Sequence, residues 1–557
     1  MTKRPTPNGT EMKRRDFLKG TTATFGAAVA ASVAGPSTNA FAGKAGTVVK
    51  PVQLMTATAK FDPVRPESAR LIAQAAKKIG WDVQAQPIDY NQNVQKVIMQ
   101  HDFDMWLVRF TGASIRIDPN VFIWQLHHTT QDKKGGYNFA GYDSPALNKI
   151  AEAQQREMNI EKRRELVFEA QAMIAGDQPS HVLVNPKMTN AYRSDRIRNL
   201  VPQMGEGIGS FWTDVGMEVV SGDGYVRTGA TAALKNLNPV NVNDANEFKE
   251  LRMIYDRLFR VGPDGKPRPW AAESFNIVDA TTIDITLRSG MKWHDGKPVT
   301  LEDVKFTFEY HKKWKAPFFN AQLQKILSID ITGSNSLRFK LSEPFAPLLS
   351  NLFGSIFLIP KHIWQDIPEK VDIDDPLNFA NTKPIGSGPF TVDYWDRGKE
   401  LKVSAFKEHF NPPKVAGIIR IVYGSHDAMA AAIEKNECDR TRYILKPSLM
   451  EDLNKVANCV GEAYPSHGFY TLGYNNRREP FNDPAFRQAI QYVMPKDLIR
   501  DLVLAGHASD GGSVIAPVNE FWHNSAVKAP SQDFDKAKKM LSDAGYTWKG
   551  GKLHYPG

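Results

Sequence analysis

The sequence predicts an α/β fold with several domain-sized cores, and three observations lead to this prediction. The chain has 557 residues, of which 42% are hydrophobic and 24% charged. This length suits about three cores of roughly 150 residues, and the composition is ordinary for a globular protein. Residues 48–110 alternate between strand and helix patterns, as in an α/β layer. Residues 275–406 carry three β-hairpin patterns instead, so the middle of the chain is organised differently.

The alternating region reads β-α-β-α-β. Its first helix opens at Pro66, presents one apolar face and stops at Gly80. A longer helical pattern begins with Ser144-Pro145 as cap and first turn, and it is expected to break near Met158-Asn159. In chain order, the predicted segments are a strand at 48–58, a helix at 66–80, a strand at 81–89, a helix near 91–100, a strand at 104–110 and helical segments within 144–175.

The middle of the chain is rich in hairpins. They are predicted at 275–287, at 328–344 around the turn GSNS and at 386–406 with Gly398 in the turn. A helix between the first two begins after Thr300, and Asp303 three residues later completes a capping-box pattern. Further on, helix and strand alternate again over 425–455, a strand is predicted at 470–476, and a helix at 483–494 has Asp483 as cap and Pro484 at its first position.

The C-terminal segment raises a question of pairing. A helix ends at Ala544-Gly545, and the run YTWKGGKLHY that follows predicts two short strands around Gly550-Gly551. An isolated two-stranded hairpin is marginally stable in water, so it needs a partner.

The N-terminal 42 residues have the features of an export signal. Arg14 and Arg15 lie within KRRDFLKG, an Ala-rich stretch follows, and AFA at 40–42 fits a cleavage site. The pattern is typical of twin-arginine signals, and the apolar stretch is too short to anchor the chain in a bilayer. We expect cleavage after Ala42 and a periplasmic protein; the alternative is a basic, unstructured N-terminus.

The charge balance does not indicate nucleic-acid binding. The net charge is +9, but residues 1–42 carry six Lys/Arg and two Asp/Glu, which leaves +5 for the rest of the chain. A diffuse charge of this size over a large surface is a weak signal for nucleic acid. Cys438 and Cys459, the two cysteines, do not make a disulfide scaffold, and whether they form a single disulfide stays open.

The segment LRSGMKWHDGKPVTLEDVKFTFEY at 287–310 resembles the signature of family 5 extracellular solute-binding proteins, the peptide, dipeptide and nickel-type receptors of ABC importers. Further matches extend the resemblance over nearly all of residues 45–557. They are YNFAGYDSPALNKI at 137–150, LNP at 237–239, MIYDRLFR at 253–260, GSGPF at 386–390, LGYNNRREPFNDPAFRQAIQY at 472–492 and FDKAKKMLSDAGY at 534–546.

The resemblance implies a two-lobed periplasmic-binding-protein fold of the cluster C type, with ligand between lobes that are joined by hinge crossings near 183–187 and 463–470. The motifs stand in a different order, with the family's last third first, so we interpret the chain as circularly permuted; joining Gly557 to about Gly46 restores the usual order. The restored order implies that the partner strand of the C-terminal hairpin lies around Val48–Ala57. A truncated or misassembled gene is the alternative. The implied segments are lobe II at 45–183 and 466–557, lobe I at 184–260 and 384–465, and an extra subdomain of lobe I at 261–383.

The function implied by the resemblance is capture of a small solute and its delivery to the permease subunits of an ABC importer, by a monomer without catalysis, cofactor or bound metal. A periplasmic peptide-binding chaperone or sensor is one alternative. A hydrolase is another, but the sequence contains no GxSxG, HExxH, CxxC or phosphate-loop motif. His127 and His128 are adjacent, and adjacent residues do not face one metal site on a helix.

The ligand-binding segment departs from the peptide-binding pattern. Peptide-binding members hold the peptide amine with an aspartate in a segment resembling GWxADYxEP. The corresponding residues here are RFTGASIRIDPNVF at 109–122, where Ile115 replaces the aspartate and Gly112 the tryptophan. Arg109 matches a ligand-contacting arginine of the family. We therefore expect a ligand that is not a standard peptide held by its amine, and Arg109 and Arg116 suit a carboxylate or a phosphate.

Other candidate ligand contacts carry a structural alternative. Asp118 either contacts ligand or caps a turn before Pro119. Asn475 follows a strand near the lobe crossing, and Ser387 lies in a glycine-rich turn that permits close backbone approach. The aromatic candidates, each either ligand contact or core, are Trp106, Trp124, Trp395, Tyr470 and Tyr474.

Overall fold

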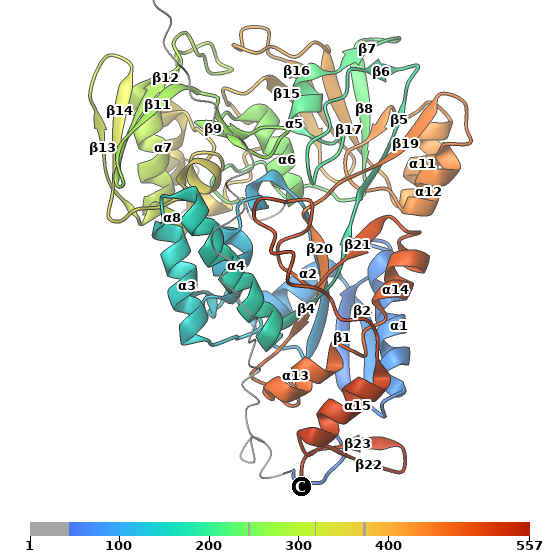
Figure 1. The fold of residues 1–557 in the computed structure, drawn as a ribbon. Coiled ribbons are helices and arrows are strands. Elements are labelled where there is room, and N and C mark those ends of the chain that lie inside the picture. Colours follow the sequence, from blue (N-terminus) through green and yellow to red (C-terminus); the bar gives the residue numbers. More distant parts are fainter. Residues whose placement is uncertain (1–43, 243–244, 318, 371–374) are drawn as a thin grey trace, which may run out of the picture. The chain divides into compact units, whose positions relative to one another are not determined.

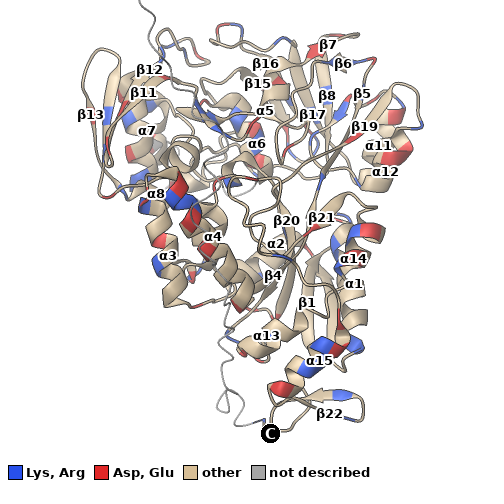
Figure 2. Ribbon diagram, in the orientation of Figure 1, with Lys and Arg blue, Asp and Glu red and all other residues tan. Residues whose placement is uncertain are grey.

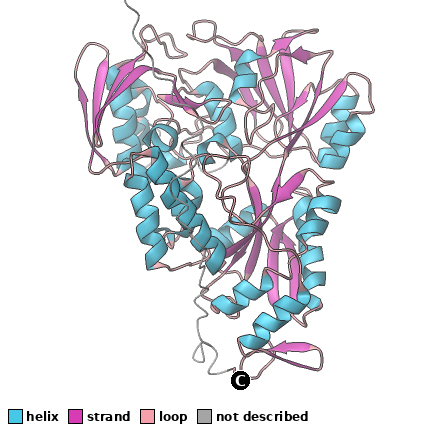
Figure 3. Ribbon diagram, viewed as in Figure 1, coloured by secondary structure: helices cyan, strands magenta, loops and turns pink. Residues whose placement is uncertain are grey.

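The computed structural model describes residues 44–242, 245–317, 319–370 and 375–557 (Figure 1). The predicted export signal at residues 1–42 lies outside the described residues. In the described part of the chain, no helix has the length and apolar character needed to cross a membrane. Figure 3 shows helices packed beside each of the main groups of strands.

One large sheet combines strands from the two ends of the chain. Its order is β2-β1-β3-β20-β4-β21. β1 is parallel to β2 and β3, whereas β20 lies between β3 and β4 and is antiparallel to both. The strands are β1 (Val52–Ala57), β2 (Val83–Ile88), β3 (Met105–Phe110), β4 (Ser180–Pro186), β20 (Phe469–Tyr474) and β21 (Ala508–Asp510).

Both faces of this sheet are covered. Met105 and Leu107 of β3 belong to the core shared with α1, α13 and α15, while Trp106 and Val108 face the core shared with α3 and α4. β3 is therefore buried along its whole length, as is typical of a central strand in an α/β layer. The helices are α1 (Val64–Lys77), α2 (Tyr90–Val94), α3 (Pro145–Arg156), α4 (Ile160–Asp177), α13 (Pro484–Ile490), α14 (Lys496–Leu498) and α15 (Phe534–Asp543).

A second large sheet has seven strands in the order β15-β16-β17-β8-β18-β5-β19. Two hydrophobic cores pack against this sheet. Two helices contribute Phe211 and Phe248 to the first core, and two other helices contribute Met429 and Met450 to the second. The first two are α5 (Phe211–Gly216) and α6 (Ala245–Ile254), and the others are α11 (His426–Glu434) and α12 (Pro447–Leu453). The strands are β5 (Met188–Arg193), β8 (Tyr225–Ala230), β15 (Phe390–Asp396), β16 (Glu400–Ala405), β17 (Gly417–Val422), β18 (Arg440–Thr441) and β19 (Cys459–Tyr464).

A four-stranded antiparallel sheet, β11-β12-β14-β13, contains two of the predicted hairpins, and the third predicted hairpin is β15-β16. The capping box is confirmed: Thr300 Oγ1 accepts from Asp303 N, and Thr300 N donates to Asp303 Oδ2. The elements of this region are β11 (Ala272–Asp279), β12 (Thr282–Leu287), α7 (Leu301–Lys313), α8 (Asn320–Leu323), β13 (Ile326–Ile331), β14 (Ser336–Leu341), α9 (Lys361–Trp364) and α10 (Ile367–Lys370).

Two further pairs of short strands are antiparallel. They are β6 (Ile197–Arg198) with β7 (Glu218–Val219), and β9 (Phe259–Val261) with β10 (Pro267–Pro269).

The chain passes between the two large sheets in two places. Lys187 alone separates β4 of the first sheet from β5 of the second. Residues 465–468 connect β19 of the second sheet to β20 of the first. These connections fall within the segments 183–187 and 463–470 that the sequence indicated as crossings.

The C-terminal hairpin is present, but the prediction for its partner was only partly right. β22 (Thr547–Lys549) pairs with β23 (Lys552–His554), and Val48 forms a single bridge with His554. Val49 N donates to Leu553 O (2.8 Å) and Gly46 N to Pro556 O (3.1 Å). The rest of the expected partner is β1, whose backbone pairs with β2 and β3 and is not available to the hairpin.

Local signals placed several helix starts correctly, but the helix expected at 66–80 spans Val64–Lys77 and the one expected at 483–494 ends at Ile490. The break near Met158-Asn159 separates α3 from α4, and Asn159 caps α4 by accepting from two backbone N–H groups. Asp483 caps α13, with Pro484 in its first turn. The helix expected near 91–100 is instead the short α2 followed by a π-helical turn at Gln95–Met99.

Candidate functional site

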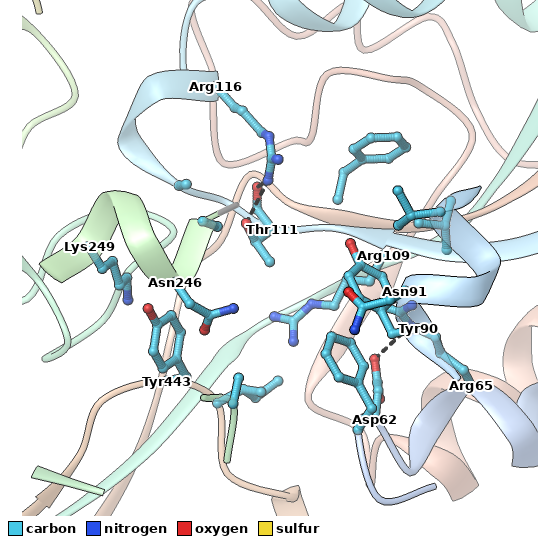
Figure 4. A pocket seen from close by; sticks show the side chains of 18 of the residues that line it. Asp62, Arg65, Tyr90, Asn91, Arg109, Thr111, Arg116, Asn246, Lys249 and Tyr443 are labelled. Carbon is cyan, nitrogen blue, oxygen red and sulfur yellow. Dashed lines mark hydrogen bonds and ion pairs between the residues drawn. The ribbon is translucent and has the colours of Figure 1, made fainter. Parts of the chain in front are cut away.

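A cavity of about 530 Å³ is lined by residues from the regions of both large sheets (Figure 4). One side consists of the residues before and in α1, α2 with its π-helical turn, and β3 with the loop after it. The other side consists of the segment around Glu206, the loop after β8, the start of α6 and residues 443–444. Since residues from both sides line the cavity, a solute that fills it would contact both sides.

Aromatic rings form part of the first side. Phe61 and Tyr90 stack with their centroids 4.3 Å apart, and the Arg65 guanidinium lies over both rings. Trp106 of β3 also lines the cavity and packs edge-on against Phe139. Aromatic faces of this kind provide apolar contact area with little conformational entropy to lose.

Asp62 is the acidic residue on this side, and its charge is already matched. Its Oδ2 accepts from Arg65 Nε (2.9 Å) and from the Tyr470 hydroxyl (3.1 Å), and its Oδ1 accepts from Val64 N. Burial of the Tyr470 ring, together with the Asp62 carboxylate, raises the pKa of Tyr470 above its ordinary value, so the hydroxyl keeps its proton. These donors leave Asp62 with little capacity to hold a ligand ammonium group.

Arg109 is a buried cation without an acidic partner among the described residues. It lies on β3 opposite Tyr470 of β20, and its guanidinium is 5.6 Å from the centroid of that tyrosine ring. Its Nε and Nη2 are buried and make no hydrogen bond within the described chain. Leaving such a charge buried and unpaired is costly, so the site favours an anionic group that accepts from these nitrogens.

Arg116 lines the same cavity from the loop after β3. Its Nη1 donates to Thr111 Oγ1 (2.7 Å) and Thr111 O (3.3 Å), which holds the guanidinium in place. Neither acceptor is a carboxylate, so these bonds do not form an ion pair. In Figure 4 its side chain is directed toward Thr111.

The second side of the cavity carries Lys249 on α6 and Glu206. Lys249 is 4% exposed; its Nζ donates to Arg442 O (3.3 Å) and lies 4.4 Å from the centroid of the Tyr443 ring. Burial lowers the pKa of Lys249 to about 7. Burial alone would raise the pKa of Glu206, but Arg252 and Lys249 outweigh it and hold that pKa at about 2.

The charges that line the cavity are predominantly positive. Both acidic groups, Asp62 and Glu206, already pair with an arginine. The buried nitrogens of the lining that lack a hydrogen-bond partner in the described chain include Arg65 Nη1, Trp106 Nε1 and two nitrogens of Arg109, which can only donate. The cavity therefore suits a solute that brings acceptors and negative charge. Its basic lining residues are Arg65, Arg109, Arg116, Lys235 and Lys249.

Of the candidate residues from the sequence, Trp106, Arg109 and Arg116 line this cavity. Asp118 does not: its carboxylate accepts from Arg163 Nη1 (3.0 Å) and Nη2 (2.7 Å) and from Asn120 N. The turn interpretation of Asp118 is thus the one that the structure supports, because its acceptors are occupied by groups inside the fold.

Four other candidates also lie outside the cavity lining. The Tyr470 hydroxyl donates to Asp62, which itself lines the cavity. Tyr474 is fully buried and stacks against Phe481. Asn475 donates to His101 O and Phe103 O, and Ser387 is 1% exposed in its turn. The two further aromatics named from the sequence, Trp124 and Trp395, are likewise outside the lining; they contact His128 and Arg397.

Several lining residues were not found from the sequence. Asp62 and Arg65 lie just before the predicted helix start at Pro66, where a cap or turn is the ordinary interpretation. Lys249 lies in a helix whose charged residues look solvent-facing in the sequence. No local signal indicates the cavity at these positions, because it is created by contacts with residues far away in the chain.

The two histidines considered as metal ligands form hydrogen bonds within the fold, and the two cysteines are buried. His127 Nδ1 bonds to Phe122 O, and burial lowers its pKa to about 4; His128 bonds to Thr130 and Glu152. The described residues contain no cluster of three or more His, Cys, Asp or Glu positioned to hold a metal ion. Cys438 and Cys459 are both free and buried.

Comparison with known proteins gives consistent matches. The model of the family "Bacterial extracellular solute-binding proteins, family 5 Middle" matches residues 266–555. The dipeptide-binding protein of Escherichia coli is 26% identical over 315 residues, covering 52% of this chain and 58% of that protein. The oligopeptide-binding protein AppA of Bacillus subtilis is 27% identical over 305 residues, covering 53% and 54%. The chain thus spans little more than half the length of these curated relatives.

Solved structures match to a similar extent. The structure of AppA from Bacillus subtilis in complex with a nonapeptide has a TM-score of 0.50 and 22% identity, covering 58% of this chain and 65% of that one. The structure of NikZ from Campylobacter jejuni in complex with Ni(L-His) has a TM-score of 0.50 and 22% identity, covering 60% and 66%. At this identity, the likeness concerns the fold.

Proposed function

The chain belongs to the bacterial extracellular solute-binding proteins of family 5, with their two-lobed α/β fold, and on that premise we propose that it captures an acidic small solute in the periplasm for an ABC importer. The two large sheets are the two lobes, and the connections at Lys187 and at 465–468 are the hinge. The proposed partner is the permease of that importer. The proposed action is binding and release of the solute without turnover.

The observation that carries the proposal is the excess of positive charge in a cavity lined from both lobes. A solute that contacts both sides favours the closed arrangement, because the full set of contacts exists only there. A decisive shift toward closure needs about 5 kcal/mol of differential binding. Charge-assisted hydrogen bonds from Arg109 and contact with the Phe61–Tyr90 stack are interactions strong enough to contribute to it.

The proposed ligand class differs from a peptide held by its amine. Ile115 is buried at the position where peptide-binding members have the aspartate, and Asp62 is matched by Arg65 and Tyr470. The cavity volume, about 530 Å³, lies within the range of small-molecule sites. We propose a carboxylate- or phosphate-bearing solute whose acidic group accepts from Arg109.

The test is native mass spectrometry of protein purified from the periplasm without denaturation, followed by release and identification of the bound compound. We expect one acidic compound per chain. A peptide whose free amine is required for binding would contradict the ligand assignment and leave the receptor class intact. Conversion of the compound during incubation would contradict binding without turnover.

We also propose that the order of the motifs reflects circular permutation. Three observations support it: β20 lies between β3 and β4, the segment 46–49 is hydrogen-bonded to the C-terminal hairpin, and collinear matches stop at little more than half of the relatives' length. The segments named in the sequence analysis are proposed as lobe II, lobe I and the extra subdomain.

A further inference from the structure

Behind Lys249 lies a buried cluster of charged side chains, which we call the lobe I charge cluster. Each member is at most 2% exposed. Three are acidic and four are arginines, so the cluster has one positive charge in excess, and Lys249 adds a second when it is protonated. The members are Glu206, Asp214, Glu250, Arg252, Arg420, Arg440 and Arg442.

Ion pairs connect the whole cluster. Asp214 pairs with Arg440 at 2.5 Å and with Arg442 at 2.6 Å. Glu250 pairs with Arg442 at 3.1 Å, and Arg420 Nε lies 3.2 Å from the same carboxylate. At the cavity end, Arg252 pairs with Glu206 at 2.5 Å. Each of the three carboxylates already forms an ion pair with at least one arginine, and none forms an ion pair with Lys249 in the described chain.

Lys249 joins this cluster to the cavity. Glu206 and Asp214 favour its charged form, whereas Arg252 and Arg442 oppose it. The Tyr443 ring lies against its Nζ, and the Arg442 carbonyl accepts from it. The charged neighbours therefore act in both directions, and burial is the largest cause of the lowered pKa of Lys249.

From this arrangement we infer that Lys249 binds an acidic group of the solute as an ammonium ion, so that capture of the solute takes up a proton. The inference rests on the proposed function, since it concerns the same cavity and the same acidic ligand. In lobe II, Arg109 supplies the guanidinium that lines the same cavity. In lobe I, Lys249 supplies a charge that the solute itself stabilises.

The physical basis is the burial of the Lys249 amine beside the cavity. Burial lowers the pKa of Lys249 to about 7, so near neutral pH a large share of the ligand-free protein holds a neutral amine. A carboxylate or phosphate beside the amine favours the ammonium form and raises this pKa. The apparent affinity should therefore be constant below that pKa and fall about tenfold per pH unit above it.

The neighbouring cavity groups do not produce the same pH dependence. Burial is the main cause that lowers the pKa of His426, so this ring stays neutral between pH 7 and 8. The strongly lowered pKa of Glu206 keeps that residue ionised throughout the same range. Lys235 lines the cavity too, but its side chain is exposed.

The experiment uses the full mature chain and, as probe, the small-molecule fraction of yeast extract below about 1 kDa. Retained compounds are identified by native mass spectrometry, and the retained compound is then titrated calorimetrically at pH 6 and pH 8. We expect an acidic compound with about tenfold tighter binding at pH 6. In wild-type protein at pH 7, titrations in two buffers of different ionisation enthalpy should show uptake of about half a proton.

Variants separate the lysine from other sources of pH dependence. Lys249→Met should weaken binding at pH 6 by about tenfold or more, because a charged hydrogen bond is lost. Lys249→Arg should retain binding but lose the pH dependence. Lys399→Met is the matched control, because it makes the same substitution at an exposed lysine that does not line the cavity, and it should bind as the wild type does.

The outcomes distinguish the two claims. An acidic compound that binds equally at pH 6 and pH 8 without proton uptake overturns the inference and leaves the proposed function standing. A retained compound that is neutral or basic overturns the inference and the acidic ligand, but not the receptor class. If wild-type protein retains no compound at either pH, the proposed function itself fails, and the inference fails with it.

Discussion

At the scale of single residues, Arg109 is the feature on which the ligand assignment depends. Its two buried, unpartnered nitrogens are costly without an acceptor, and the Tyr470 ring compensates only in part. We predict that Arg109→Gln weakens binding of the retained compound by about tenfold to a hundredfold. The same change should leave the thermal midpoint of the ligand-free protein unchanged or higher.

Titration calorimetry and thermal unfolding test the two halves of this prediction separately. Arg116→Gln is a suitable comparison, because Arg116 lines the same cavity but donates to Thr111. It should have the smaller effect on binding. If Arg109→Gln binds as tightly as the wild type, Arg109 does not contact the solute.

For Asp118 we predict the opposite result, because its carboxylate is already paired with Arg163. It forms a bidentate pair with Arg163, and the two side chains are 9% and 3% exposed. Asp118→Asn leaves the arginine buried without a charged partner, which should lower the free energy of unfolding by about 3 kcal/mol. Affinity for the retained compound should not change in the folded variant.

Urea denaturation measures this loss, with Asp452→Asn as control. Asp452 pairs with Lys455 on the surface, and its removal should leave stability unchanged. A stable Asp118→Asn variant with reduced affinity would restore the ligand role that the sequence left open.

At the scale of elements, the Asp303 carboxylate at the start of α7 connects three segments of the chain through hydrogen bonds. Asp303 accepts from Thr300 N (2.9 Å), Trp293 Nε1 (3.2 Å) and Lys361 N (2.9 Å). We predict that Thr300→Ala lowers the free energy of unfolding by about 1 kcal/mol, as for a single lost cap. Asp303→Ala should lower it by more than about 2 kcal/mol, because several buried donors lose their acceptor.

Chemical denaturation of the two variants gives the comparison. Ser425→Ala removes the simpler cap of α11, which bonds to Ala428 N alone, and it should match Thr300→Ala. Equal losses for Thr300→Ala and Asp303→Ala would show that the contacts of Asp303 beyond the cap contribute nothing.

The elements also show what the sequence could and could not predict. Hairpins, caps and the α3–α4 break depend on residues close together in the chain, so their signals are local and the predictions were correct. The position of Lys249 of α6 in the cavity lining depends on residues that are distant in the sequence. Arg442, whose carbonyl accepts from Lys249, is 193 residues away. A helix with Lys249, Glu250 and Arg252 looks solvent-facing until those partners are known to bury it.

Asp118 illustrates the same limit for a single residue. An aspartate before a proline is equally compatible with a turn and with a ligand contact, and only the position of Arg163, 45 residues away, decides between them. Arg109 was found because the family resemblance marks its position. Asp62 and Arg65 were missed because nothing around them in the sequence distinguishes a cavity wall from a helix start.

At the scale of the whole molecule, the proposed permutation predicts that the order of the segments can be changed back. Gly46 N donates to Pro556 O, so residues 46 and 557 can be joined directly, and the bend at Gly222-Asp223 is exposed and can be opened. We predict that a chain of residues 223–557 followed by 46–222 folds, with a thermal midpoint within about 5 °C of the original.

Circular dichroism and thermal unfolding check the reordered chain, and binding of the retained compound checks its cavity. The control opens the chain inside β20 at Leu472, which is buried in the sheet between β3 and β4 and should prevent folding. Failure of the 223–557/46–222 chain to fold would contradict the proposed equivalence of the two orders.

The central claim is that an acidic solute binds between the two lobes through Arg109. A crystal structure of the protein with its retained compound tests this claim most directly. We predict that an acidic group of the compound accepts hydrogen bonds from Arg109 Nε or Nη2, within about 3 Å, while another part of the compound contacts α6. A compound held by an ammonium group at Asp62, or bound outside this cavity, would contradict it.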